Sequence, residues 1–115
     1  MRNFVRGWIQ DTKGSGVRIN VLSPGAVDTE SLRRALGQAH GQDKVEESVK
    51  AMGEDTPLGR IAQPREIGLA ALFLASDASS CITGVELFAD SGYQALQFIR
   101  QPGLIFFYDC HLSKF

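Results

Sequence analysis

The segment at residues 17–22 limits the folds open to this chain more than any other feature. It is rich in β-branched residues, lies between Gly16 and Pro24, and is too short for a convincing helix. Because Val21 and Leu22 are consecutive apolar residues, at least the C-terminal end is expected to be covered on both faces, as in parallel sheets between helix layers. The sequence therefore predicts a strand of a parallel sheet.

Helical and extended patterns alternate around this strand. A short helix with one apolar stripe precedes it, a longer helix is predicted over 64–76, and a second short strand over 85–89. Apolar residues wrap much of the circumference of the longer helix, which predicts that it is largely buried. This order is half of an alternating α/β pattern. Two parallel strands bury too little apolar surface to offset chain entropy, so the fold is expected to be incomplete.

The stretch between the first strand and the longer helix is weakly apolar. It predicts two short surface helices over 30–36 and 43–52, followed by a loop over 53–63.

Composition narrows the class of protein. The 115 residues are 43% apolar and 22% charged with a formal net charge of -1, which is typical of a soluble globular chain. Lys and Arg are dispersed, so no nucleic-acid partner is predicted. The apolar run at 104–108 is far shorter than the roughly 20 residues that cross a bilayer, and the start lacks the apolar core of a secretory signal. We therefore expect no membrane partner, a cytoplasmic location, and reduced thiols at Cys81 and Cys110.

The loop at 23–29 follows the predicted strand, where open α/β folds bind ligands. Pro24 has no N–H to donate and ends the strand, and Gly25 lets a flat ligand approach the main chain. Thr29 stands at the mouth of the next helix, where its hydroxyl can cap free N–H groups or meet a ligand. A plain turn followed by an N-cap explains the same residues, so both interpretations stay open.

Residues 17–29 resemble the strand and Pro-Gly loop of the short-chain dehydrogenase/reductase family. Five further segments resemble that family's C-terminal landmarks in the same order: Pro57-Leu58-Gly59-Arg60, Gln63-Pro64-Arg65-Glu66-Ile67, Leu72-Phe73-Leu74-Ala75-Ser76, Ile82-Thr83-Gly84 and Asp90-Ser91-Gly92. Ser91 departs from a pattern in which Gly is more usual. The resemblance implies that 1–93 form the C-terminal half of a Rossmann-like, doubly wound parallel sheet, two strands with flanking helices. Residues 30–63 would be its substrate-loop region, and 94–115 an atypical apolar tail.

The resemblance also implies a function, namely hydride transfer between a nicotinamide cofactor, NAD or NADP, and an alcohol or carbonyl substrate. Pro24 and Gly25 would lie beside the nicotinamide, and the main chain of Val27 and the hydroxyl of Thr29 would hold its carboxamide. Three residues of this region could face a substrate: Leu32, Leu36 and Val45. Ordinary packing explains each of them better.

Two motifs of that family are not found in these 115 residues. The nearest match to Gly-x-x-x-Gly-x-Gly, at 37–43, ends in Asp43 and follows no predicted strand, and neither Tyr93 nor Tyr108 has a Lys four positions later. We therefore assign no catalytic residue and expect a C-terminal portion that is inactive alone. Alternatively, the chain is an interaction module that forms homo-oligomers or binds an intact relative through 64–76 and 85–89, or a truncated gene product without function.

The remaining polar candidates favour ordinary roles. Adjacent side chains seldom converge on one ion, so no metal site is predicted at 109–111. Asp28 is expected to complement a helix dipole. Solvated positions are expected for His40, Arg33 and Arg34.

Overall fold

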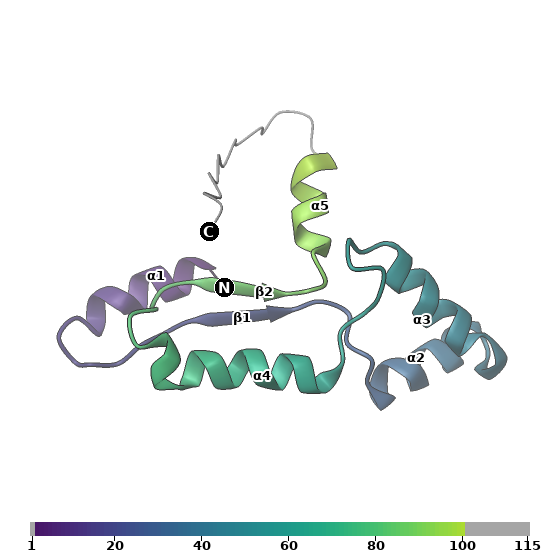
Figure 1. Ribbon diagram of the computed structural model, residues 1–115, viewed down its shortest axis with the longest axis horizontal. Helices are drawn as coiled ribbons and strands as arrows, with labels where there is room; N and C mark the ends of the chain where they lie inside the picture. Colours follow the sequence, from purple (N-terminus) through teal and green to yellow (C-terminus); the bar gives the residue numbers. More distant parts are fainter. Residues whose placement is uncertain (1, 101–115) are drawn as a thin grey trace, which may run out of the picture.

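The computed structural model describes residues 2–100, which form a two-stranded sheet with flanking helices (Figure 1). The elements in chain order are α1 (Arg2–Asp11), β1 (Val21–Pro24), α2 (Glu30–His40), the 3-10 turn η1 (Gln42–Lys44), α3 (Val45–Glu54), α4 (Pro64–Ala75), the 3-10 turn η2 (Asp77–Ser79), β2 (Glu86–Ala89) and α5 (Tyr93–Arg100).

The two strands pair in parallel, as the sequence predicted. Val21 lies opposite Glu86 and Pro24 opposite Ala89, so the register runs without a bulge. The predicted bounds of the first strand were wrong, because β1 spans Val21–Pro24 and not 17–22. Pro24 fits inside β1 because the backbone N–H at this position would point away from β2. None of the described residues pairs with that outer edge of β1, so the missing N–H costs no hydrogen bond there.

Side-chain hydrogen bonds add to the backbone pairing just before β1. Arg18 donates through Nη1 to the Ser79 hydroxyl at 2.8 Å and to the Ile82 carbonyl at 3.3 Å, and through Nη2 to the Ser76 carbonyl at 3.1 Å. Asn20 donates to the Ile82 carbonyl at 3.0 Å and accepts from the Val85 amide at 3.2 Å. These bonds tie the entry of β1 to the turn after α4, next to the backbone bond from the Gly84 amide to the Ile19 carbonyl at 2.7 Å.

The helices α1 and α4 lie on opposite sides of the two strands (Figure 1), as expected for a sheet between helix layers. The prediction that the longer helix is largely buried was wrong: none of its residues is buried, and Leu72 is 63% exposed, Leu69 49% and Phe73 39%. The reason is that α4 packs on the strands with one face, and no described element covers the other. Among residues 5 and 7–97, whose burial the structure describes, the buried apolar residues are Val5, Val45, Ile61 and Ala62.

The middle of the chain forms the two predicted surface helices, joined by η1. Their predicted bounds were wrong, because α2 continues to His40 and α3 spans Val45–Glu54 and not 43–52. Both stand beyond the ends of the strands, away from α1 (Figure 1). The two glycines of the nearest match to Gly-x-x-x-Gly-x-Gly, Gly37 and Gly41, lie inside α2 and at its C-terminal end. The match therefore does not directly follow a strand.

Part of the predicted apolar tail is helical, since α5 covers Tyr93–Arg100. Residues 101–115 lie outside the described residues. They include the rest of the tail and Cys110, as well as the candidate metal ligands at 109–111. Cys81 is an exposed free thiol. Within residues 2–100, no helix combines the length and apolarity needed to cross a membrane, and no three His, Cys, Asp or Glu side chains gather as metal ligands would.

Candidate functional site

The loop at 23–29 leaves the C-terminal end of β1 beside the end of β2. The Gly25 amide continues the ladder by donating to the Ala89 carbonyl at 3.2 Å. A Cβ built on Gly25 would lie only 2.7 Å from Cβ and 2.8 Å from Cα of Asp90. The structure therefore gives Gly25 a packing reason to be glycine, in addition to the ligand approach that the sequence suggested.

Val27 makes an isolated parallel bridge with Ala62. The Asp28 amide donates to the Ala62 carbonyl at 2.8 Å, and the Ala62 amide donates to the Ala26 carbonyl at 3.0 Å. In a parallel bridge of this kind the N–H of the central residue points away from the partner strand. No acceptor among the described residues receives the Val27 N–H, so this amide remains a hydrogen-bond donor for a ligand.

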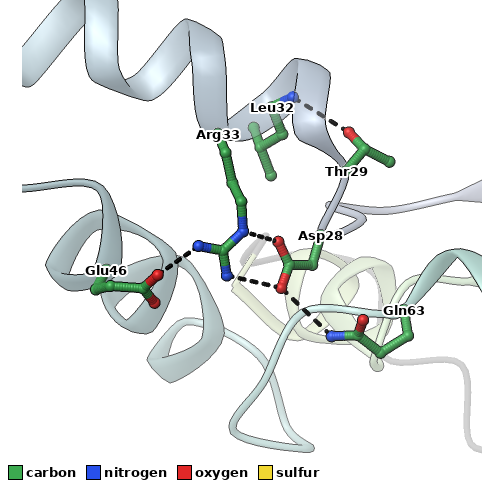
Figure 2. Close-up of polar contacts among 6 residues, drawn as sticks. All are labelled: Asp28, Thr29, Leu32, Arg33, Glu46 and Gln63. Atoms are coloured by element: carbon green, nitrogen blue, oxygen red, sulfur yellow. Dashed lines mark hydrogen bonds and ion pairs between the residues drawn. The ribbon is translucent and has the colours of Figure 1, made fainter. Parts of the chain in front are cut away.

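Thr29 caps the N-terminus of α2. Its backbone is extended, with φ −110° and ψ 156°, and its hydroxyl oxygen accepts from the Leu32 amide at 3.1 Å (Figure 2). The hydroxyl proton takes no part in that bond and remains available to a ligand acceptor. The two interpretations of Thr29, as a cap and as a ligand contact, are therefore compatible.

A charged cluster surrounds Asp28, between these two residues (Figure 2). Arg33 donates to both oxygens of the Asp28 carboxylate, through Nε at 2.6 Å and Nη2 at 3.0 Å, and its Nη1 donates to Glu46 on α3. The side-chain amide of Gln63 donates to the same carboxylate through Nε2 at 3.4 Å. The hydrogen bond from Arg33 lowers the pKa of Asp28, and the bonds to Asp28 and Glu46 raise the pKa of Arg33.

The sequence interpretation of these charges needs revision. Arg33 is held by two carboxylates and is not a freely solvated side chain, whereas Arg34 is 68% exposed and pairs with Glu30 at 2.9 Å. Asp28 is only 16% exposed, and its partner is a guanidinium in the first turn of α2. An acidic residue just before the cap and an arginine five positions later was the signal available in the sequence.

A second ion pair fixes the start of α4. Arg60 donates to both carboxylate oxygens of Glu66 at 2.8 and 2.7 Å, and the backbone amide of Gln63 donates to the same carboxylate at 2.8 Å. These bonds lower the pKa of Glu66 to about 2, the bond from Arg60 being the larger cause. Both residues border a hollow of about 580 Å³ at the end of β2, between α4 and α5. Residues 23–29 do not line this hollow, so we do not regard it as the cofactor site.

The residues considered for substrate contact are placed differently. Val45 is 5% exposed, which fits packing. Leu36 and His40 border a hollow of about 710 Å³ between α2 and α3, where Nδ1 of His40 lies 3.1 Å from the Ser48 hydroxyl. Leu32 is partly exposed on α2.

Comparison with known proteins decides the family. The family model described as Enoyl-(Acyl carrier protein) reductase matches residues 1–94. The chain belongs to the short-chain dehydrogenase/reductase family. It is 40% identical over 92 residues to oxidoreductase asL5 of Sarocladium schorii, covering 80% of this chain and 34% of the relative. It is 45% identical over 83 residues to the 2,3-dihydro-2,3-dihydroxybenzoate dehydrogenase of Escherichia coli, covering 69% and 32%.

Solved structures of short-chain dehydrogenases confirm the fold. A C-terminal deletion mutant of Thermoplasma acidophilum aldohexose dehydrogenase matches with a TM-score of 0.76 and 30% identity, over 82% of this chain and 41% of that one. The described residues are thus part of a Rossmann-like fold, as predicted. The chain spans about a third of the length of the curated relatives above, 34% and 32%.

Proposed function

We propose that this short-chain dehydrogenase/reductase segment supplies one wall of a nicotinamide site in an oxidoreductase that interconverts an alcohol and a carbonyl. The observation that carries the proposal is the pair of unused donors after β1, the Val27 N–H and the Thr29 hydroxyl. When bound there, the nicotinamide would supply or accept the hydride. The names of the relatives, which include dehydrogenases of diols and sugars, support an alcohol or carbonyl substrate.

The hydrogen-bonding groups of the loop support a carboxamide as the ligand. A carboxamide offers one strong acceptor and two donors, which match an outward amide N–H and a hydroxyl two residues later. Pro24 and Gly25 would form a second side of the proposed site, on the face of Gly25 that Asp90 does not fill. Assayed as these 115 residues, the chain is expected to show no turnover, because it contains neither a Tyr-x-x-x-Lys pair nor the glycine-rich turn of the family.

Titration of the ¹⁵N-labelled chain with NADH, and separately with NADPH, tests the proposal. We expect shifts of the Val27 and Thr29 amide resonances that exceed those of α4. Thr29→Val removes the hydroxyl and should weaken the response about threefold to tenfold, the effect of one net hydrogen bond, whereas Thr29→Ser should retain it. No shift at these amides with either cofactor at millimolar concentration would overturn the proposal.

A turnover assay complements the titration. NADH or NADPH is incubated with the chain and a panel of ketones and aldose sugars, which can accept the hydride. We expect oxidation of the cofactor at the background rate. Cofactor-dependent turnover well above background would refute the expectation that these residues are inactive alone.

A second candidate function is subunit association through residues 64–76 and 85–89. The observation in its favour is the uncovered apolar face of α4, together with Phe88 on β2, which is 37% exposed. Contiguous apolar surface of this kind is typical of protein interfaces. Sedimentation should show a dimer that Leu72→Glu converts to a monomer, while Arg65→Glu at the exposed start of α4 does not. Light scattering of a mixture with an intact relative tests the heteromeric alternative, and independent species only would exclude it.

A further inference from the structure

The α2–α3 pair stands apart from the sheet. Each of these helices makes its main contacts with the other and with η1, and not with the strands or α4 (Figure 1). No residue of α2 is buried, and α3 buries only Val45 and Gly53. Packing therefore holds the pair together, but its angle relative to the strands still needs a restraint at its base, where Gly53 also lies close to the backbone of Arg60.

Polar contacts at the base of the pair supply that restraint. Arg33 is the residue common to them, because its guanidinium contacts Asp28 on the loop and Glu46 on α3 (Figure 2). A planar guanidinium that donates two parallel bonds to one carboxylate defines an orientation as well as a distance. Gln63 extends the contact to the segment before α4.

We infer that Arg33 is a positioning residue that sets the angle of the α2–α3 pair relative to the loop at 23–29. Asp28 directly precedes Thr29, whose hydroxyl oxygen is held by the first turn of α2. The orientation of α2 and the direction of the Thr29 hydroxyl are consequently linked. That this link matters for cofactor binding rests on the proposed function, whereas the positioning itself does not.

The first test uses the full 115-residue chain without ligand. Arg33→Gln is compared with Arg34→Gln, a matched control that breaks the exposed pair with Glu30. Arg33→Gln should speed amide hydrogen exchange in α2 and the start of α3 about threefold to tenfold, since Asp28 is largely covered. Arg34→Gln should change it by about twofold at most. Arg33→Lys should rescue only part of the protection, because it keeps the charge without the planar fork.

Residual dipolar couplings report the orientation of α2 relative to α4. A general loss of stability would not change that orientation. In the wild type, couplings from α2 and α4 should fit a single alignment tensor, and in Arg33→Gln they should require two. Equal exchange in Arg33→Gln and Arg34→Gln would overturn the inference. So would unprotected α2 amides in the wild type, or a single shared tensor in Arg33→Gln.

The cofactor titration then separates this inference from the proposed function. If Arg33 positions the loop, Arg33→Gln should weaken the NADH response at the Val27 amide, and Arg34→Gln should not. The wild type could show slower α2 amide exchange than Arg33→Gln and a single alignment tensor for α2 and α4, yet no NADH response. That result would remove the proposed function and leave the positioning role intact. A normal NADH response in Arg33→Gln would refute the link to Thr29.

Discussion

Replacing Gly25 with alanine asks whether this glycine is required by packing or only by a ligand. The new Cβ would lie 2.7 Å from Cβ and 2.8 Å from Cα of Asp90, closer than carbon atoms approach in proteins. Neither strand end can move freely, because the Gly25 amide donates to the Ala89 carbonyl at 3.2 Å. We therefore expect Gly25→Ala to push apart the C-terminal ends of β1 and β2.

The cost has two sources. Overpacking typically lowers the free energy of unfolding by about 1–3 kcal/mol. Asp90 also accepts from the Gly92 amide at 2.9 Å and the Gln94 amide at 2.7 Å, so its displacement weakens the start of α5. Together these effects predict a loss of about 2 kcal/mol, or about 8–16 °C in Tm for a domain of this size.

Urea unfolding followed by far-UV circular dichroism provides the measurement. Gly68→Ala is the matched control, because no heavy atom lies within 4 Å of the Cβ that would be added there in α4. In a helix interior this control should raise stability by about 0.5–1 kcal/mol. If Gly25→Ala were as stable as the wild type while Gly68→Ala behaved as expected, the packing explanation would be refuted and ligand approach alone would remain.

Three further predictions concern stability. Ser91 has a φ of 58°, so Ser91→Gly should raise the free energy of urea unfolding by about 1 kcal/mol, and Ser91→Ala, which keeps a Cβ, should not. The pKa of Glu66 lies near 2, below its unfolded value, so its ion pair stabilises the fold above about pH 4.3 and the benefit is lost as pH falls toward 2. Glu66→Gln should therefore flatten the acid limb of the stability profile, and a carboxyl resonance titrating near pH 4.3 in the wild type would contradict this. Arg18→Gln, which loses the bond to the buried Ser79 hydroxyl, should lower unfolding free energy by about 1.5–3 kcal/mol, with Arg18→Lys intermediate; an unchanged urea midpoint would exclude this role.

Local sequence patterns predicted the features that short-range chemistry determines. The Pro-Gly step after a β-branched run marked the end of β1, and Pro64 with Glu66 marked the start of α4. The cap role of Thr29 was one of the two interpretations that the sequence offered, because its residue type and position suffice for that role.

Features that depend on distant segments were missed. The bonds from Arg18 to Ser79 and from Asn20 to Ile82 join residues more than 60 positions apart, so no local pattern signals them. The burial of α4 was predicted wrongly because periodicity identifies an apolar face but not whether another element covers it. The contact of Arg33 with Glu46 depends on how α2 packs against α3, which the sequence spacing alone does not define.

The three residues from Val27 to Thr29 form a tight turn, in which the Thr29 amide donates to the Val27 carbonyl at 2.8 Å. In this turn the Asp28 carboxylate binds the guanidinium of Arg33, whereas the Thr29 hydroxyl oxygen meets the Leu32 amide, so the two side chains have separate partners (Figure 2). Asp28 can therefore bind Arg33 without occupying the space beside the Thr29 hydroxyl. Since the Val27 N–H also points away from Ala62, the polar groups offered to a ligand and those that restrain the loop are separated by geometry. A substitution at Asp28 should consequently act on cofactor binding through loop position, and one at Thr29 through a lost hydrogen bond.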